Sequence, residues 1–405
     1  MEAIQGEEST LSAAMRRNLV LLACCQAVGQ AGSTLMFSAT ALSIITFYDR
    51  HELATLPVTL QHVGVMLSVF PAGALMMRMG RRFGFHMGSL FGMTGSALCA
   101  VGLYFATFWI MCLGGLILGY AVASLQMYRF AAIELAPPSY RARAISWVTA
   151  GGVAAGVIGP MIARATFDQI QPIFLGTYLA MIAVHAVVFI IMAFIRFPKI
   201  TAASRPTGPQ RSLWEIASQP RFAAAVIAGM VSYGTMSFLM SASPLAIVAC
   251  GLPQSEAPWV IFVHVMGMFV PSFFTGNLIT RFGVNRVMFA GALILAAGVL
   301  AALAGISEWY FRASLMLNGV GWNFMFVGAT TVVTTCYRPQ ERGKAQALND
   351  FLIFGTTASS SFFAGYLQDR LGWQALNEFS FILIVIALLA VAWLKFQKPP
   401  QHAIV

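Results

Sequence analysis

The sequence predicts an all-α integral membrane protein with twelve transmembrane helices in two pseudo-symmetric six-helix halves. Hydrophobic residues make up 59% of the chain and charged residues only 9%, and the mean hydropathy of +0.77 is far above that of soluble domains. Apolar runs long enough to cross a bilayer recur from end to end. Two short basic motifs also recur at nearly one spacing, which indicates an internal duplication.

The apolar runs define the predicted spans in order. The first six cover residues 18–47, 56–77, 84–107, 109–133, 143–164 and 173–195. The second six cover residues 221–249, 258–278, 287–306, 310–336, 344–367 and 375–396. The single long connection is rich in Pro, Ser and Arg and follows span 6. We therefore predict an N-terminal six-helix half at 1–195, a cytoplasmic linker at 196–220 and a C-terminal six-helix half at 221–405.

The basic residues predict the orientation of these spans. Of the 24 Lys and Arg residues, 19 lie before span 1, in the alternate loops that include the linker, and after span 12. The opposite side carries only Arg50, Arg164, Arg312 and Arg370, and Arg129 lies within span 4. By the positive-inside rule both termini are cytoplasmic. The net charge of +10 is therefore explained by membrane topology, and we expect the lipid bilayer, not nucleic acid, as the partner of this surface.

The two repeated motifs follow equivalent spans of the two halves. GALMMRMGRRFG (73–84) follows span 2 and GNLITRFGVNR (276–286) follows span 8, at an offset of 203 residues. PSYRARA (138–144) follows span 4 and PQERGKA (339–345) follows span 10, at an offset of 201 residues. Parallel repeats of six helices about an axis normal to the membrane are one of the plans on which transporters are built.

With these halves and the G-x-L-x-x-R-x-G-R-R turn after span 2, the chain resembles the major facilitator superfamily over its whole length. The resemblance implies a secondary transporter of the bacterial inner membrane that moves a small-molecule solute by alternating access, with protons as the coupling ion, and acts as a monomer. The family carries an Asp before the first Arg of this turn, where this chain has Met77 and, in the second copy, Thr280. Glu134 matches another acidic position of the family, with Arg81 as its expected partner.

The missing carboxylate leaves the inner gate without its usual acid. Ionisable groups inside a span cost roughly 2.5–3.5 kcal/mol on insertion scales and are functional candidates. Arg129 in span 4 and Asp350 in span 11 lie at similar depths near the cytoplasmic face. Our hypothesis is that Asp350 takes over the gate, paired with Arg129, Arg78 or Arg81, and that its protonation couples transport to protons. The alternative is that Asp350 only braces helix packing beside Asn349.

A second set of polar and aromatic residues lies on spans 1, 4, 7 and 10, which line the central cavity in the family. The candidate substrate-binding residues are Gln26, Gln30, Gln126, Tyr128, Arg129, Tyr233, Asn318, Trp322 and Asn323. Amides, rings and one Arg suit a mostly apolar or aromatic solute with a few polar atoms. The alternative is that the amides join helices, which is worth about 0.6 kcal/mol for each hydrogen bond.

Small residues spaced by four mark a third feature. They occur at Gly64, Ser68 and Ala72 in span 2, at Gly152, Gly156 and Pro160 in span 5, and at Gly355 and Ser359 in span 11. Small side chains let membrane helices approach closely. We expect these faces to form the contacts between the two halves.

Enzyme signatures are absent from the sequence. It contains no phosphate-binding Gly-x-x-x-x-Gly-Lys-Ser/Thr loop, no His-Glu-x-x-His and no Gly-x-Ser-x-Gly. We therefore predict no enzymatic activity, no catalytic residues, no cofactor and no metal site. An uncoupled facilitator and a multidrug/proton antiporter remain as alternatives to a proton-coupled transporter, and the direction of transport stays open.

Overall fold

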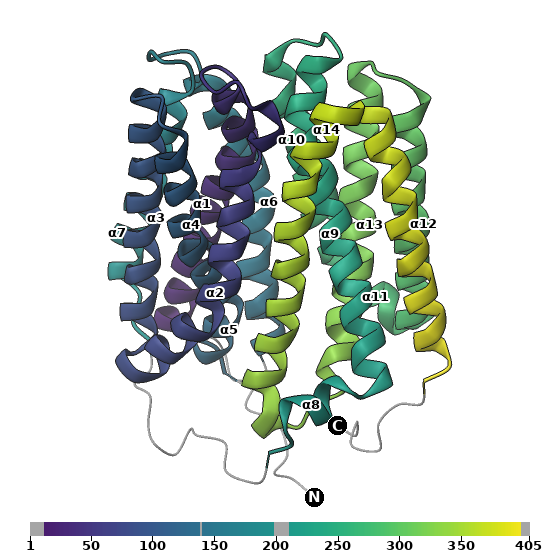
Figure 1. Cartoon of the computed structure of the whole chain (residues 1–405). Helices are drawn as coiled ribbons and strands as arrows, with labels where there is room; N and C mark the ends of the chain where they lie inside the picture. The colour runs from purple at the N-terminus through teal and green to yellow at the C-terminus, as the bar shows by residue number, and fades with distance from the viewer. Residues whose placement is uncertain (1–11, 138–139, 198–209, 398–405) are drawn as a thin grey trace, which may run out of the picture.

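A computed structural model describes residues 12–137, 140–197 and 210–397, and every regular element within these ranges is a helix (Figure 1). This confirms the predicted all-α class. Nine of the described helical stretches are long and apolar enough to cross a membrane. The predicted spans at 143–164 and 310–336 correspond to α6 and α13, which fall outside those nine, while α14 holds the last two predicted spans in one continuous element. The helices therefore fit the twelve predicted spans.

The first half consists of α1 (Ala13–Ile44), α2 (Leu56–Met79), α3 (Arg81–Tyr104), α4 (Phe108–Gln126), α5 (Tyr128–Glu134), α6 (Arg141–Thr166) and α7 (Leu175–Ala193). A one-turn helix, η1 (His51–Leu53), precedes α2. Helices α4 and α5 together occupy predicted span 4 and are separated only by Met127. Helix α1 packs between α6 and α7, and α4 packs against both α2 and α3.

The second half consists of α9 (Pro220–Ala249), α10 (Ala257–Phe269), α11 (Ser272–Phe282), α12 (Val284–Ala304), α13 (Glu308–Thr334) and α14 (Arg342–Lys395). The short helix α8 (Leu213–Ala217) leads into it, and one-turn helices lie at Gln254–Glu256 and Pro339–Glu341. Helix α14 reverses direction at Gly372, where φ is +77°. Only glycine adopts such a backbone readily, and it divides α14 into the two arms that match predicted spans 11 and 12.

The repeated basic turns have the same backbone in both halves. Gly80 separates α2 from α3 with φ +91° and ψ 158°, and Gly283 separates α11 from α12 with φ +86° and ψ 148°. These two glycines are 203 residues apart, the offset of the sequence repeat. Positive φ without a Cβ penalty explains why both copies place Gly there.

The two halves stand side by side, with α1–α7 on one side and α9–α14 on the other (Figure 1). They touch mainly where α2 packs on α14 and α6 packs on α10. A Cβ added to Gly152 of α6 would lie 2.7 Å from the Phe269 ring of α10, so this face joins the halves as predicted. Gly64 does not: an added Cβ would strike the carbonyl oxygen of Leu116 on α4. At Gly64, span 2 therefore packs inside the first half, because α2 and α4 approach there backbone to backbone.

An ion pair ties the end of the linker to the second half. The Arg211 guanidinium lies 2.6 Å from the carboxylate of Glu341, whose side chain is completely buried. The backbone N–H groups of Arg211 and Arg338 also donate to this carboxylate, and the Lys344 ammonium donates to the Arg211 carbonyl. These donors hold the pKa of Glu341 at about 2, with the Arg211 side chain as the largest cause. We call the end of the bundle that carries this ion pair and α8 the linker end, and the end that carries η1 the distal end.

We expect Glu341→Ala to destabilise the folded chain by about 1.5–3 kcal/mol, the usual worth of hydrogen bonds to a charged group. The thermal midpoint in detergent at pH 7 measures this. Because the pKa is lowered, the contribution is complete above the ordinary value of 4.5 and is lost as the pH falls toward about 2. The exposed Glu378→Ala on α14 serves as the control. Equal midpoints for the two variants would contradict a stabilising role of the ion pair.

Candidate functional site

A cavity lies between the two halves and is lined by residues of both. We call it the central cavity. Its lining from the first half is Gln30, Ser33, Thr34, Phe37, Gln61, His62, Val65, Val122 and Gln126. Its lining from the second half is Tyr233, Met236, Met240, Val265, Met268, Phe269 and Phe354. Within the described part of the chain, this lining contains no Asp, Glu, Lys or Arg.

Three of the predicted binding residues reach this cavity. Gln30 of α1, Gln126 of α4 and Tyr233 of α9 all line it. The ring of Tyr233 meets those of Trp322, Phe326 and Phe354 edge-on, at centroid distances of 5.4, 5.3 and 5.6 Å. Trp322 therefore stands behind Tyr233 and supports it, rather than lining the cavity itself.

The structure places two predicted amides away from the central cavity. The Asn323 side chain donates to the Met268 carbonyl at 2.7 Å and to the Ser272 hydroxyl at 2.6 Å, and accepts from Thr275 at 2.6 Å. It joins α13 to the break between α10 and α11, so the helix-joining alternative describes it. Asn318 is 1% exposed, and its amide has no hydrogen-bond partner among the described residues.

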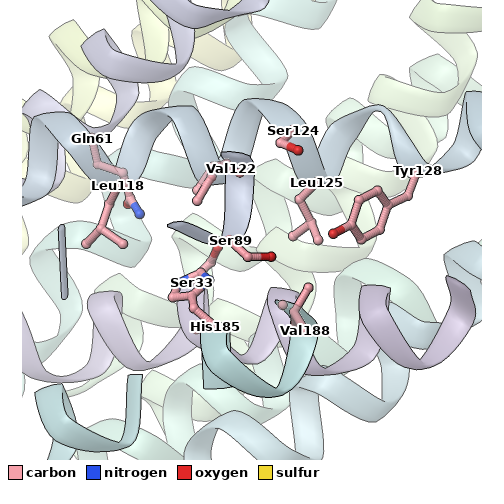
Figure 2. Close-up of a pocket in the computed structure, with 14 residues that line it drawn as sticks. Ser33, Gln61, Ser89, Leu118, Val122, Ser124, Leu125, Tyr128, His185 and Val188 are labelled. Carbon is pink, nitrogen blue, oxygen red and sulfur yellow. The ribbon is translucent and has the colours of Figure 1, made fainter. Parts of the chain in front are cut away.

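Gln26 and Tyr128 also lie outside the central cavity. Gln26 is partly exposed on α1. Tyr128 is 2% exposed and packs edge-on against Phe85 at 4.7 Å, in the core of its own half. Its hydroxyl points into a smaller space within the first half (Figure 2).

This smaller space, the first-half cavity, is bordered by α1, α2, α3, α4, α5 and α7. Ser89, Ser124, Tyr128 and His185 give it a polar lining (Figure 2). Ser33, Gln61 and Val122 line both cavities. His185 is seated in the gap left by Gly92, where an added Cβ would strike the ring, so the absence of a side chain at 92 makes room for the imidazole.

Sequence reasoning missed Gln61 and His62, which bring two polar side chains of α2 to the central cavity. They are 3% and 6% exposed, and the His62 ring lies 5.8 Å from that of Phe37. A Gln-His pair inside an apolar run is the sequence feature that could have indicated these two residues. A second buried histidine, His264, follows 202 residues later in the equivalent span. The Nδ1–H group of His264 donates a hydrogen bond to the Leu315 carbonyl at 2.7 Å, as expected of a histidine in the protein core.

At the distal end the halves are held by short contacts. The Thr55 hydroxyl donates to the Ser361 carbonyl of α14 at 2.8 Å. An added Cβ on Gly365 would lie 3.1 Å from the Cβ of Thr55. The Arg164 guanidinium of α6 lies 5.3 Å above the ring of Trp259 on α10. Hydrogen bonding, backbone approach and a cation–π contact together close this end.

At the linker end the contacts between halves are looser. The guanidinium of Arg342 on α14 lies 5.3 Å from the Phe130 ring on α5, and that of Arg129 lies 4.9 Å from the same ring. Asp350 accepts a hydrogen bond from the Asn349 amide at 3.0 Å. Arg129 is its electrostatic neighbour across the halves, but among the described residues Asp350 has no cation within 4.0 Å.

The other members of the predicted gate lie on the first half. Arg81 pairs with Glu134 at 2.7 Å, the contact expected from the sequence. Arg78 is exposed at the end of α2. With Arg81 already paired, Arg129 is the basic residue of the predicted set that the structure brings into the electrostatic neighbourhood of Asp350.

Comparison with other sequences identifies related proteins. The pattern of the Major Facilitator Superfamily matches residues 20–244 and 225–405. The riboflavin transporter RfnT of Brucella anthropi is 40% identical over 383 residues, which cover 94% of this chain and 96% of that protein. The uncharacterized MFS-type transporter YddS of Bacillus subtilis is 25% identical over 396 residues, covering 93% and 91% of the two chains.

Comparison with solved structures supports the same fold. The D-xylose-proton symporter superposes with a TM-score of 0.74 at 15% identity, covering 96% of this chain and 99% of the other. The human organic anion transporter MFSD10 superposes with a TM-score of 0.69 at 14% identity, covering 93% and 99%.

The distal contact can be fixed covalently. We expect the double variant Thr55→Cys and Gly365→Cys to form a disulfide under mild oxidation, because the two Cβ positions lie 3.1 Å apart and a separation by a few tenths of an ångström brings them to the roughly 3.5–4.5 Å that a disulfide spans. The cross-link should hold the distal end closed and stop solute from crossing, and reduction should restore crossing. Peptide mapping measures the bond and solute flux in vesicles measures the effect, with Thr55→Cys alone as control. Full flux through the oxidised pair would show that this end does not open.

Proposed function

The chain belongs to the Major Facilitator Superfamily, and from this premise we propose that it carries a riboflavin-like solute across the membrane by alternating access, coupled to protons through Asp350. Its relatives are membrane transporters, so the chain is a multi-pass transporter and not an enzyme. The main support for a riboflavin-like solute is the cavity between the two halves, which is uncharged and lined by amides and aromatic rings.

The lining suits a neutral heteroaromatic solute. Gln30, Gln61 and Gln126 offer amide donors and acceptors, while Tyr233 and Phe354 are among the aromatic residues of the other wall. Riboflavin carries a flat ring system with several carbonyl and N–H groups, and the 40% identical relative is a riboflavin transporter. Its hydroxylated tail makes it more polar than the mostly apolar solute expected from the sequence.

The two unequal closures support alternating access. The distal end is closed by the Thr55–Ser361 hydrogen bond and close packing. The linker end is bridged by the Arg342–Phe130 contact and by the longer-range attraction of Arg129 and Asp350. Rocking of α2 against α14 and of α6 against α10 would exchange these closures and expose the central cavity to each side in turn.

Coupling is assigned to Asp350 because of its placement. An ionised carboxylate inside a span needs a cationic partner, and Arg129 on the other half is the available one. Neutralising Asp350 by a proton would weaken the attraction between the halves and favour opening of the linker end. The two alternatives to this proposal are an uncoupled facilitator and a multidrug/proton antiporter.

We also propose a division of the chain into moving halves and a location in the cell. Two six-helix halves, at 1–195 and 221–405, would move as units about the linker at 196–220. The chain would act as a monomer in the bacterial inner membrane with both termini in the cytoplasm, as the distribution of basic residues favours.

Riboflavin should bind the purified protein and raise its thermal midpoint, since a ligand at 100 times its Kd stabilises the folded state by about 2.7 kcal/mol. The 5′-phosphate of riboflavin should bind much more weakly, because no cation lines the cavity to pair with a phosphate. A thermal-shift titration in detergent measures both, and flux in vesicles follows. If riboflavin produced neither a shift nor flux, the proposed solute class would be wrong.

Asp350→Asn should bind riboflavin within about twofold of the wild type but fail to accumulate it in vesicles that carry a pH gradient. The physical reason is that the amide cannot lose or gain the coupling proton at this site. Exchange of labelled riboflavin without a gradient should persist. The matched control is Asp369→Asn, on the exposed distal part of the same helix. Normal gradient-driven accumulation by Asp350→Asn would exclude Asp350 as the proton carrier.

A further inference from the structure

We propose that the two halves recognise different parts of the solute: the first half reads the hydrogen-bonding edge of a heteroaromatic ring, and the second half stacks on its face. The edge is assigned to Gln30, Gln61 and Gln126, and the face to the wall around Tyr233 and Phe354. This inference rests on the proposed function and adds which residues decide specificity.

The polar groups of the central cavity come almost entirely from one half. The first half supplies Gln30, Ser33, Thr34, Gln61, His62 and Gln126, whereas Tyr233 is the single polar residue that the second half contributes to the lining. The three glutamines come from three helices, α1, α2 and α4, and so converge on the cavity from different directions. The polar wall of the cavity is therefore a property of the first half.

The amides of these glutamines are unpaired within the described part of the chain. Gln30 accepts a hydrogen bond from Thr34 only at its backbone carbonyl, at 3.0 Å, and its side-chain amide makes no hydrogen bond to any described residue. Gln61 is only 3% exposed, and its amide makes no hydrogen bond to any described residue. A polar group that loses its water without gaining a new partner costs about 1–3 kcal/mol, so a solute that displaces water from these amides must hydrogen-bond to them in its place.

The chemistry of an amide defines the edge that it can bind. Each glutamine presents a carbonyl acceptor beside an NH₂ donor, and can pair bidentately with an N–H next to a C=O. The pyrimidinedione end of a flavin has that pattern, with an imide N–H between two carbonyls. Because no charged residue lines the cavity, the polar wall favours a neutral edge over a carboxylate or phosphate.

The opposite wall offers surfaces without hydrogen-bonding direction. Met236, Met240, Met268, Phe269 and Phe354 line it. Thioethers and aromatic rings bind the faces of flat rings through dispersion and sulfur–aromatic contacts. Tyr233 is held among Trp322, Phe326 and Phe354 at centroid distances of 5.3–5.6 Å, which fixes its orientation. Such a wall accepts many rings and discriminates little among their edges.

The two roles can be separated with riboflavin and its N3-methyl analogue, which has the same ring face but a blocked imide N–H. The wild type should bind riboflavin at least tenfold more tightly than the analogue. Replacement of a glutamine that reads this edge, tested as Gln30→Met, Gln61→Met and Gln126→Met, should weaken riboflavin about tenfold and leave the analogue within twofold. Phe354→Leu should weaken both ligands by the same factor and keep their ratio.

Gln26→Met is the matched control, because Gln26 lies on α1 outside the cavity lining, and it should keep both affinities. Each variant is first checked for a single symmetric gel-filtration peak, and Gln→Leu replaces any Met variant that fails. Equal wild-type affinity for the two flavins, or an unchanged ratio in all three glutamine variants, would overturn edge recognition while leaving riboflavin transport intact. Absence of binding of either flavin to the wild type would overturn the proposed function as well.

Discussion

The contact between the two halves, α2 on α14 and α6 on α10, is the constraint on which the rest of the structure depends. It must be close enough to seal the bundle and smooth enough to slide. Gly152 and Gly156 on α6 meet Phe269 and Met266 on α10 without an intervening side chain. The contact thus relies on dispersion between well-fitted surfaces, which is the main source of helix association in a bilayer. The polar side chains between the halves line the central cavity instead of this contact.

The described ion pairs follow a consistent division. Arg81–Glu134 and Arg211–Glu341 are each formed within one half or between a half and its linker, near the linker end. Asp350 differs, because its electrostatic partner Arg129 lies on the other half and is not in ion-pair contact. Pairs inside a half can stay intact while the halves move, whereas a charge opposite the other half changes its environment with every movement. This placement across the two halves is what the proposed coupling role of Asp350 rests on.

The sequence predicted the helices and the repeat well, because hydrophobic length and turn chemistry are local properties. The glycines of the two basic turns share one left-handed backbone, as the repeat required. The site was predicted less well. Tyr128 faces the core of its half because two residues along a helix turn its side chain about 200° away from that of Gln126, which lines the cavity. Gln61 and His62 were not predicted because they lie on span 2, whereas the family resemblance implies a cavity lined by spans 1, 4, 7 and 10.

The duplicated architecture and the unequal cavity walls belong together. Gly80 and Gly283 keep the same backbone at the linker end, where both halves need the same tight turn between consecutive helices. In the cavity the equivalent helices have diverged: α2 presents Gln61 and His62, while α10 presents Val265, Met268 and Phe269. A solute without twofold symmetry that sits between two related halves shows a different side to each. Identical walls could match only one of those sides, so the proposed division of amides on one half and rings on the other fits one asymmetric solute.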